Sequence, residues 1–331
     1  MQALVTGGAG FIGSHLVEGL VADGHSVVVL DDLSSGNLEN LATVRNAITL
    51  VHGDICQPDS YLPYLPSTDW VFHLAAKTSV NESFQLAEAY RTINAQATDT
   101  LLYESSKAGV KRVVISSTCA VYGDIGTVAA SESLLTKPKS PYAVTKLQNE
   151  LAAEFYAQTM GLETMALRYF NVYGSRQKAE SPYSSVLSKF IASYQTKTSP
   201  LVFGDGLQTR DFIHVSDIVQ ANLLAAKTTI NPNTPNPTVL NIGTGHAISV
   251  LALLQAVSDA FGYTLPVTFN PARQGDIRHS VASITAAQSV LGFAPKVTVD
   301  AGVRGLVNEA LKQSKPSLPV NSSSVLLASG L

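Results

Sequence analysis

Short runs of apolar and β-branched residues alternate with longer stretches of helical periodicity through the first half of the chain. We predict six strands from these runs, at Ala3–Thr6, Val27–Asp31, Ile48–Asp54, Trp70–Ala76, Arg112–Thr118 and Thr164–Phe170. Strands that alternate with helices are typical of a parallel sheet with crossover connections. The pattern therefore predicts an α/β fold built on a doubly wound parallel sheet, whose ligands bind beyond the carboxyl ends of the strands.

The alternation becomes looser in the second half of the chain. We expect a smaller lobe to begin there with a polar loop at Gly174–Ser181, a helix ending near Gln195 and a strand at Leu201–Phe203. The strands Phe212–Val215 and Val239–Ile242, with the helix between them, are expected to return to the main sheet.

These elements divide the chain into two interleaved parts. We predict a Rossmann domain in residues 1–172 plus about 209–248, and a C-terminal substrate-binding lobe in about 173–208 plus 249–312. The last stretch, 313–331, contains six serines and no convincing periodicity, which predicts a loose tail.

Composition and charge narrow the possible partners. Charged residues make up 14% of the 331 residues, against roughly 25% in typical soluble domains, which indicates much buried surface and favours a subunit interface. The net charge of −3 offers no basic field for nucleic acid or anionic lipid. The longest apolar run, Val250–Leu254, is far too short for a membrane helix.

Cellular location and metal content can be judged from the same sequence. The N-terminus shows no signal peptide, and the two cysteines, Cys56 and Cys119, are far apart in the chain. We therefore expect a soluble, cytoplasmic protein without disulfides. The seven histidines show no paired spacing of metal ligands, so no metal site is expected.

A glycine-rich turn follows the first predicted strand. Gly7, Gly10 and Gly13 have the spacing G-x-x-G-x-x-G before a predicted helix, where backbone N–H groups can approach a diphosphate. Such glycines alone could form a mere tight turn, but Asp31 ends the second strand eighteen residues after Gly13. Its carboxylate can accept hydrogen bonds from ribose hydroxyls and would repel a 2′-phosphate, which favours NAD over NADP. Asp32 could share this role.

A second candidate lies in a helix that we expect to begin at Ser140 and Pro141 and to end before Gly161. Tyr142 and Lys146 then lie one turn apart on the same face of this helix. A tyrosine is a poor base near neutral pH, and a nearby ammonium group stabilises its phenolate. The Tyr142–Lys146 pair is therefore a candidate proton-transfer pair.

The surroundings of this pair are also predicted. Val144, Leu147, Leu151 and Phe155 form an apolar stripe that we expect to face the core, leaving the Tyr142–Lys146 face free for a ligand. The fifth strand ends in hydroxyls at Ser116, Ser117 and Thr118, which can hold or relay the proton.

At this point the sequence resembles the extended short-chain dehydrogenase/reductases, and within them the nucleotide-sugar 4-epimerases. The resemblance covers about residues 2–312. It rests on nine motifs in family order: TGGAGFIGSHL, LDDLSSGN, GDI (53–55), HLAA (73–76), SSTCAVYGD (116–124), SPYAVTK (140–146), LRYFNVYG (167–174), GDGLQTRDFIHVSDI (204–218) and RQGDIRHS (273–280).

The resemblance implies a role for each matching residue. Thr118, Tyr142 and Lys146 would be catalytic, and NAD would be bound by Gly7, Gly10, Phe11, Ile12, Gly13, Asp31, Asp54, Ile55, Ala75, Ala76, Asn94, Tyr142 and Lys146. The UDP-sugar would be bound by Thr118, Tyr142, Asn171, Phe203, Arg210, Arg273, Asp276 and Ser280. The planar guanidinium groups of the two arginines suit a diphosphate.

The implied reaction is epimerisation of a UDP-hexose at carbon 4 through a transient 4-keto intermediate. Related 4,6-dehydratases carry an Asp-Glu pair after the threonine, and UDP-glucuronate decarboxylases carry a Glu two positions after it. Cys119 and Ala120 stand there in this chain, and neither can act as an acid or base. A UDP-glucuronate epimerase or decarboxylase, with Arg278 facing the carboxylate, is the alternative, and a non-catalytic NAD sensor is a remote one.

The sequence also suggests which hexose fits. By resemblance, Ser280 lies against the 2-substituent of the sugar, where a small residue goes with N-acetylated substrates. This favours UDP-GlcNAc/UDP-GalNAc, with UDP-Glc/UDP-Gal as further substrates, and the chain looks most like UDP-N-acetylglucosamine 4-epimerases. The family also implies a homodimer formed by the helix near Phe84–Lys107 and the helix of Tyr142.

Overall fold

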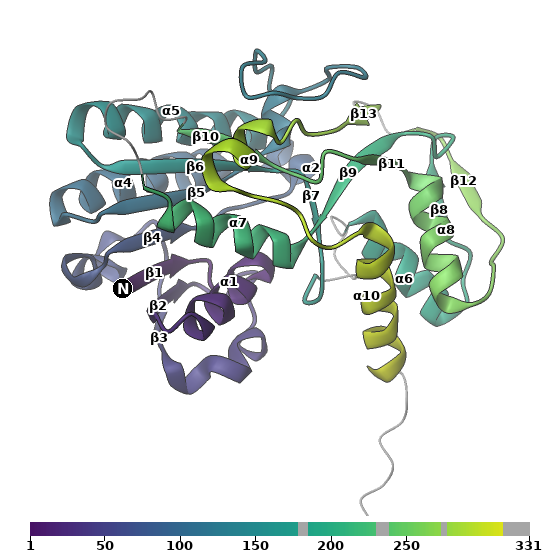
Figure 1. Cartoon of the computed structure of the whole chain (residues 1–331), viewed down its shortest axis with the longest axis horizontal. Coiled ribbons are helices and arrows are strands. Elements are labelled where there is room, and N and C mark those ends of the chain that lie inside the picture. Colours follow the sequence, from purple (N-terminus) through teal and green to yellow (C-terminus); the bar gives the residue numbers. More distant parts are fainter. Residues whose placement is uncertain (178–184, 230–237, 273–276, 314–331) are drawn as a thin grey trace, which may run out of the picture.

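The computed structural model describes residues 1–177, 185–229, 238–272 and 277–313. Its centre is a parallel sheet of seven strands, shown edge to edge on the left of Figure 1. Their order across the sheet is β3 (Ile48–His52), β2 (Ser26–Asp31), β1 (Gln2–Thr6), β4 (Trp70–His73), β5 (Arg112–Thr118), β6 (Glu163–Tyr169) and β10 (Val239–Ile242). The predicted doubly wound α/β fold is confirmed.

Helices cover both faces of this sheet, as the almost fully buried strands β1, β2, β4, β5 and β6 require. One apolar layer packs the sheet against α1 (Phe11–Ala22), α7 (Val215–Lys227) and α9 (Thr285–Leu291). The other packs it against α4 (Ala97–Ala108) and α5 (Pro141–Met160). The strand order reverses direction between β1 and β4, and this switch point is where doubly wound sheets bind dinucleotides.

The remaining elements form smaller assemblies beside the main sheet (Figure 1). One sheet contains β7 (Asn171–Tyr173), β9 (Thr209–His214), β11 (Ala247–Ser249) and β13 (His279–Ser280), and a second pairs β8 (Leu201–Phe203) with β12 (Thr268–Asn270). A third apolar cluster joins α6 (Val186–Thr196), α8 (Val250–Phe261) and α10 (Val299–Gln313). Short helical turns complete the chain: η1 (Leu38–Ala47), η2 (Pro58–Ser60), η3 (Leu62–Ser67) and η5 (Cys119–Tyr122).

One strand prediction is wrong. The segment Phe212–Val215 was expected in the main sheet, but β9 pairs with β7, β11 and β13 instead. An apolar run indicates that a strand is buried, and it does not indicate which sheet buries it. Val239–Ile242 does join the main sheet as its edge strand β10. The predicted tail lies outside the described residues from 314 onward.

The helix expected between Phe84 and Lys107 is interrupted. The chain forms α2 (Val80–Gln85), α3 (Ala87–Tyr90), a π-helical turn η4 (Arg91–Gln96) and then α4. Single π-helical turns inside helices often occur at functional sites, and this one carries the fully buried Asn94.

Helix α5 begins and ends as predicted, but only Leu147 of its apolar stripe packs against a core cluster, where it is half-buried. The Ser140 hydroxyl accepts a hydrogen bond from the N–H of Ala143, and Gly161 ends the helix with φ of +67°. Val144, Leu151 and Phe155 are 42%, 59% and 55% exposed. Periodicity identifies an apolar face without saying what covers it. The core-facing side of α5 carries Ala143, Thr145, Lys146, Asn149, Glu150, Ala153 and Tyr156.

Candidate active site

The glycine turn after β1 packs too tightly for side chains. A Cβ on Gly7 would lie 2.7 Å from the backbone nitrogen of Ala75, and a Cβ on Gly13 would lie 2.1 Å from the carbonyl oxygen of Gly7. Gly7 also has φ of +69°, which favours glycine. Gly10 precedes α1 without a side-chain cap, so the first N–H groups of the helix are open to an anion. This cradle fits the diphosphate of a dinucleotide.

Asp31 lies at the end of β2 beside the cradle. Its carboxylate accepts hydrogen bonds from the N–H groups of Ala9 and Leu33, both at 2.9 Å, and is 6% exposed. Burial raises its pKa above the ordinary value. Asp32 is exposed and accepts bonds from the backbone and hydroxyl of Ser34. The geometry therefore favours Asp31 for the ribose role.

The other proposed NAD residues border the same edge of the sheet. Ala75 and Ala76 follow β4, and the Ala75 N–H donates to the Thr6 hydroxyl at 3.2 Å. The Asn94 amide holds the backbone of Lys77 on both sides, accepting from its N–H at 2.8 Å and donating to its C=O at 2.9 Å. Phe11 and Ile12 begin α1, Asp54 and the buried Ile55 follow β3, and these roles stay predictions.

The proposed catalytic residues come from β5 and α5. Thr118 ends β5, and its hydroxyl interacts with the phenol of Tyr142 and accepts the N–H of Ala120 at 3.2 Å. Lys146 is 2% exposed, and its Nζ donates to the carbonyl oxygen of Ser116 at 2.9 Å and to the Ser116 hydroxyl at 3.3 Å. The ring of Tyr90 meets the Tyr142 ring edge to face with centroids 6.4 Å apart.

Burial disfavours the charged form of both catalytic candidates. Burial raises the pKa of Tyr142 to about 12, and the Thr118 hydroxyl opposes this shift by stabilising the phenolate. Burial lowers the pKa of Lys146 to about 8, and the Glu150 carboxylate opposes this shift by stabilising the ammonium. Strong perturbation of two neighbouring titratable groups at a ligand-binding edge is typical of a functional site.

The proposed substrate residues approach from the second sheet. Ser280 of β13 pairs in register with Arg210 of β9. The Ser280 hydroxyl lies near enough to the Cys119 thiol to lower its pKa by hydrogen bonding, and the Arg210 guanidinium lowers the same pKa by its charge. Because Cys119 in turn affects the pKa of the Tyr142 phenol, these side chains lie near one another. Asn171 begins β7 and Phe203 ends β8, whereas Arg273 and Asp276 lie outside the described residues.

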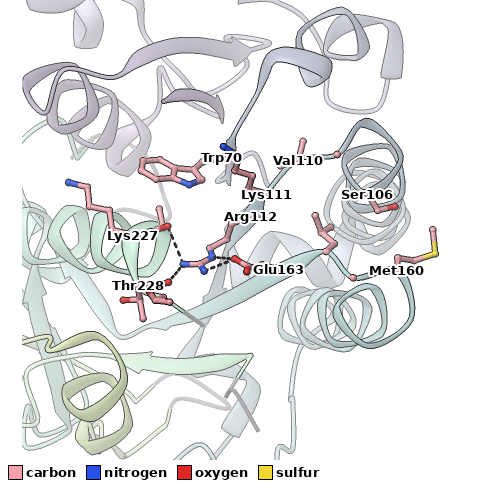
Figure 2. Close-up of a pocket in the computed structure, with 14 residues that line it drawn as sticks. Trp70, Ser106, Val110, Lys111, Arg112, Met160, Glu163, Lys227 and Thr228 are labelled. Carbon is pink, nitrogen blue, oxygen red and sulfur yellow. Dashed lines mark hydrogen bonds and ion pairs between the residues drawn. The ribbon is translucent and has the colours of Figure 1, made fainter. Parts of the chain in front are cut away.

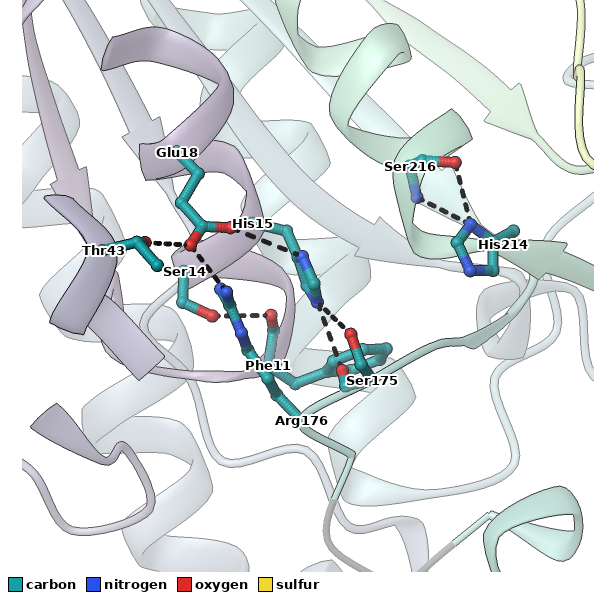
Figure 3. A network of polar contacts seen from close by, with 9 residues as sticks. All are labelled: Phe11, Ser14, His15, Glu18, Thr43, Ser175, Arg176, His214 and Ser216. Atoms are coloured by element: carbon teal, nitrogen blue, oxygen red, sulfur yellow. Dashed lines mark hydrogen bonds and ion pairs between the residues drawn. The ribbon is translucent and has the colours of Figure 1, made fainter. Parts of the chain in front are cut away.

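A polar network ties α1 to the segment after β7 (Figure 3). The Arg176 guanidinium donates to the Glu18 carboxylate at 2.6 Å, and Glu18 also accepts the Thr43 hydroxyl at 2.5 Å. The His15 ring contacts the carbonyl oxygen of Ser175 at 3.2 Å. This network fixes the segment after β7 against the helix that follows the glycine turn.

A groove of about 560 Å³ lies at the amino ends of the central strands, opposite the glycine turn (Figure 2). Its buried arginine, Arg112, donates to Glu163 and to the carbonyl oxygens of Ala225, Ala226 and Thr228 at the end of α7. Arg112 therefore caps a helix C-terminus. Strand N-termini form this edge, so the groove does not belong to the dinucleotide site.

Comparison with known proteins decides the family. Residues 3–243 match the model of the NAD dependent epimerase/dehydratase family. The chain belongs to this family. It is 37% identical over 309 residues to the UDP-glucose 4-epimerase of Mycolicibacterium smegmatis, covering 92% of this chain and 96% of the relative. The NAD dependence predicted from the glycine turn is thereby confirmed.

Solved structures of similar epimerases have the same fold. The UDP-glucose 4-epimerase of Thermotoga maritima, solved with UDP-glucose, has a TM-score of 0.89 and 36% identity, covering 95% of this chain and 100% of that one. The UDP-N-acetylglucosamine 4-epimerase of Methanobrevibacter ruminantium has a TM-score of 0.89 and 36% identity, covering 94% and 98%. The UDP-glucuronic acid 4-epimerase of Bacillus cereus, solved with NAD, has a TM-score of 0.84 and 30% identity, covering 95% and 100%.

Several buried polar residues near the candidate site have little or no signal in the sequence. Glu150 and Arg168 are buried near the catalytic candidates. Arg168 had the signal of a charge within an apolar run, whereas Glu150 lies on a helix with other charged residues and had none. The Cys119–Ser280 contact had no local signal, since 160 residues separate the two segments. Within the described ranges, no helix has the length and apolar character needed to cross a membrane, and no three metal-ligating side chains gather.

Proposed function

We propose that this chain is an NAD-dependent isomerase that inverts the configuration of a UDP-hexose at carbon 4. The observation that carries the proposal is the grouping of Thr118, Tyr142 and Lys146 beyond the ends of β5, beside a cradle that fits a dinucleotide. The similarity of this chain to UDP-sugar 4-epimerases along nearly its whole length supports the substrate class.

The side chains divide the chemistry among them. NAD, held by the glycine turn and Asp31, would supply reversible hydride transfer at the sugar carbon. Tyr142 takes the proton of the sugar 4-hydroxyl and later returns it, and Lys146 stabilises the phenolate by its charge. The Thr118 hydroxyl, in contact with the Tyr142 phenol, orients the sugar hydroxyl toward it. Arg210 supplies a fork of donors for the substrate diphosphate.

Epimerisation is favoured over elimination or decarboxylation by the two residues directly after Thr118. A further acid or base is required for both alternatives, but Cys119 and Ala120 occupy those positions. Burial raises the pKa of the Cys119 thiol to about 11, so it stays protonated near neutral pH. Neither side chain can therefore promote elimination or decarboxylation of the 4-keto intermediate in place of its reduction.

The small residues Cys119 and Ser280 support N-acetylated hexoses as substrates. Both side chains are small, and the Ser280 hydroxyl and the Cys119 thiol lie near each other and near Tyr142. The substrate pair we propose is UDP-GlcNAc/UDP-GalNAc, with UDP-Glc/UDP-Gal turned over as well. For UDP-glucuronate, Arg278 was the candidate carboxylate receptor, but its guanidinium pairs with Asp205 at 2.8 and 2.7 Å.

A product assay with purified enzyme tests the proposal. We expect UDP-GlcNAc and UDP-glucose to be converted to their 4-epimers, and UDP-glucuronate to yield neither UDP-xylose nor UDP-galacturonate. NAD is regenerated in each turnover, so enzyme purified without additions should contain dinucleotide and be active. A stoichiometric requirement for added NAD would indicate net oxidation, and inactivity on all three substrates with NAD supplied would exclude the proposed reaction.

We also propose a homodimer formed by the apolar face of α2, α4 and α5. Phe84, Tyr103, Leu151 and Phe155 are between 44% and 62% exposed on these helices. Large exposed apolar patches mark interaction sites, and burying a shared face explains the low charge content.

Light scattering at micromolar concentration should give the mass of two chains. Replacing Leu151 and Phe155 by glutamate should give monomers, because paired carboxylates would be buried without partners. The control is Leu311→Glu on α10, where an exposed leucine lies away from this face. A monomeric wild type, or a dimer unaffected by the double substitution, would refute this interface.

A further inference from the structure

A buried ion pair lies beneath the proposed catalytic residues. Glu150 on α5 and Arg168 on β6 are 3% and 5% exposed. The Arg168 Nε donates to Glu150 Oε1 at 2.9 Å, and its Nη2 donates to Oε2 at 2.6 Å. The Ser117 hydroxyl donates a further hydrogen bond to Oε1. The carboxylate is therefore held from two neighbouring strands of the sheet.

The arginine is equally well fixed. Its Nη1 donates to the Tyr122 hydroxyl at 2.8 Å, and its guanidinium carbon lies 4.7 Å from the centre of the Tyr122 ring. The Tyr122 hydroxyl donates in turn to the side chain of Asn241 at 2.7 Å. Buried ion pairs often add little to stability compared with apolar residues, so a network as complete as this one calls for a role besides folding.

The Glu150–Arg168 ion pair is linked to Lys146 of the proposed active site in two ways. Glu150 lies one turn of α5 beyond Lys146, on the same buried side of the helix. Ser117, which donates to Glu150, is adjacent in β5 to Ser116, whose carbonyl oxygen and hydroxyl receive the Lys146 ammonium. The Glu150 carboxylate thus attracts the Lys146 ammonium by its charge. Its hydrogen bond with Ser117 also fixes the end of β5 that binds this ammonium.

We propose that Glu150, held by Arg168, is a positioning residue that keeps Lys146 charged and in place beside Tyr142. This inference rests on the proposed function, in which the Lys146 ammonium stabilises the phenolate. No covalent step involves Glu150, which acts only through the charge and hydrogen bonds described above.

The other groups around Lys146 do not replace this charge. On α5 the neighbouring titratable groups are Tyr142 and Glu150, and β6 contributes the cation of Arg168. On β4, His73 is held between the hydroxyls of Thr6 and Thr98, and burial together with the Lys146 charge lowers its pKa to about 3, which keeps it neutral. Among the described neighbours, Glu150 is therefore the anion that opposes the desolvation of Lys146.

The consequence for activity follows from the coupling of the two groups. Removing one proton from the Tyr142–Lys146 pair gives either the active form, phenolate with ammonium, or the inactive form, phenol with neutral amine. Activity rises with pH until the amine loses its proton, and then reaches a plateau set by the ratio of the two forms. A lower pKa of the Lys146 ammonium lowers the plateau of activity and moves the breakpoint to lower pH. Activity below the breakpoint is unchanged.

The test is the pH profile of kcat/KM for the NAD-loaded enzyme with and without Glu150→Gln. We expect the breakpoint to fall by about one pH unit and the plateau to fall about tenfold, which corresponds to one pKa unit. Glu150→Asp keeps the charge and should retain the wild-type breakpoint. The control Glu163→Gln removes the acidic partner of another buried arginine, Arg112, at the far edge of the sheet (Figure 2) and should leave the profile unchanged.

A second measurement needs no turnover. In protein labelled with ¹³C at the lysine Cε, the Lys146 resonance, assigned by its loss in Lys146→Arg, should titrate about one pH unit lower in Glu150→Gln than in wild type. If Glu150→Gln is too unstable, Glu150→Gln/Arg168→Met removes the unpaired cation and should still shift the midpoint downward.

The outcomes separate the two proposals. An unmoved Lys146 midpoint, or a parallel loss of kcat/KM at every pH, would overturn the role of Glu150. A wild type inactive on every UDP-sugar would overturn the proposed function, whereas the Lys146 titration would still decide whether Glu150 supports the ammonium.

Discussion

Tyr142→Phe should lose at least about a thousandfold in turnover while still binding UDP. The substitution removes only the phenolic oxygen, and general acid–base groups typically contribute a hundredfold to ten-thousandfold. The ring of Tyr90 continues to pack against the remaining phenyl ring, so the geometry around it is kept. Because Arg210 and the other proposed substrate-binding residues are unchanged, the loss should appear in kcat rather than in affinity. Steady-state kinetics and UDP titration by calorimetry measure the two quantities.

Tyr156→Phe is the matched control, since it removes a hydroxyl from the same helix almost four turns away. That hydroxyl contacts Asp99 and not the proposed site, so turnover should be retained. Turnover of Tyr142→Phe within tenfold of wild type would mean that another group moves the proton.

The predictions that succeeded rest on signals written in adjacent residues. The caps of α5 need only Ser140, Pro141 and Gly161, and each acts on the backbone next to it. The glycine turn likewise depends on the close approach of Gly13 to Gly7 within the turn itself, although Gly7 also lies against Ala75 after β4. Once the parallel sheet was predicted, the carboxyl ends of its strands had to meet at one edge.

The predictions that failed required knowledge of distant contacts. The stripe of Val144, Leu151 and Phe155 has the periodicity of a core face, yet no described part of the chain covers it. The opposite face of α5 contains Lys146 and Glu150, which are buried because Ser116, Ser117 and Arg168 satisfy them. A sequence pattern ranks residues by polarity and cannot show that a charged residue has a partner on another strand. For the same reason, the helix expected across 84–107 gave no sign of the turn at Asn94.

Ser280→Tyr should distinguish N-acetylated from plain hexoses. The Ser280 hydroxyl lies near the Cys119 thiol, which in turn affects Tyr142, and Ser280 pairs in register with Arg210. In our proposal Ser280 lies against the 2-substituent of the sugar, so a phenol ring at this position would exclude the acetamido group of UDP-GlcNAc. Steric exclusion discriminates between substrates by size, because only the bulkier one meets the new group.

We expect kcat/KM for UDP-GlcNAc to fall at least about a hundredfold in Ser280→Tyr, and kcat/KM for UDP-glucose to stay within about threefold of wild type; a pocket that rejects a group outright exceeds the roughly 10–200-fold effect of one methylene. Ser280→Ala is the control, since it removes the hydroxyl without filling the space, and it should keep both activities. Competition between the two substrates, measured in one mixture by chromatography of the products, gives the ratio directly. If the tyrosine variant lost both substrates equally, the ring would be disturbing Arg210 or Cys119 rather than the 2-substituent. A wild type inactive on UDP-GlcNAc would likewise refute the assignment of Ser280 as the residue that admits the acetamido group.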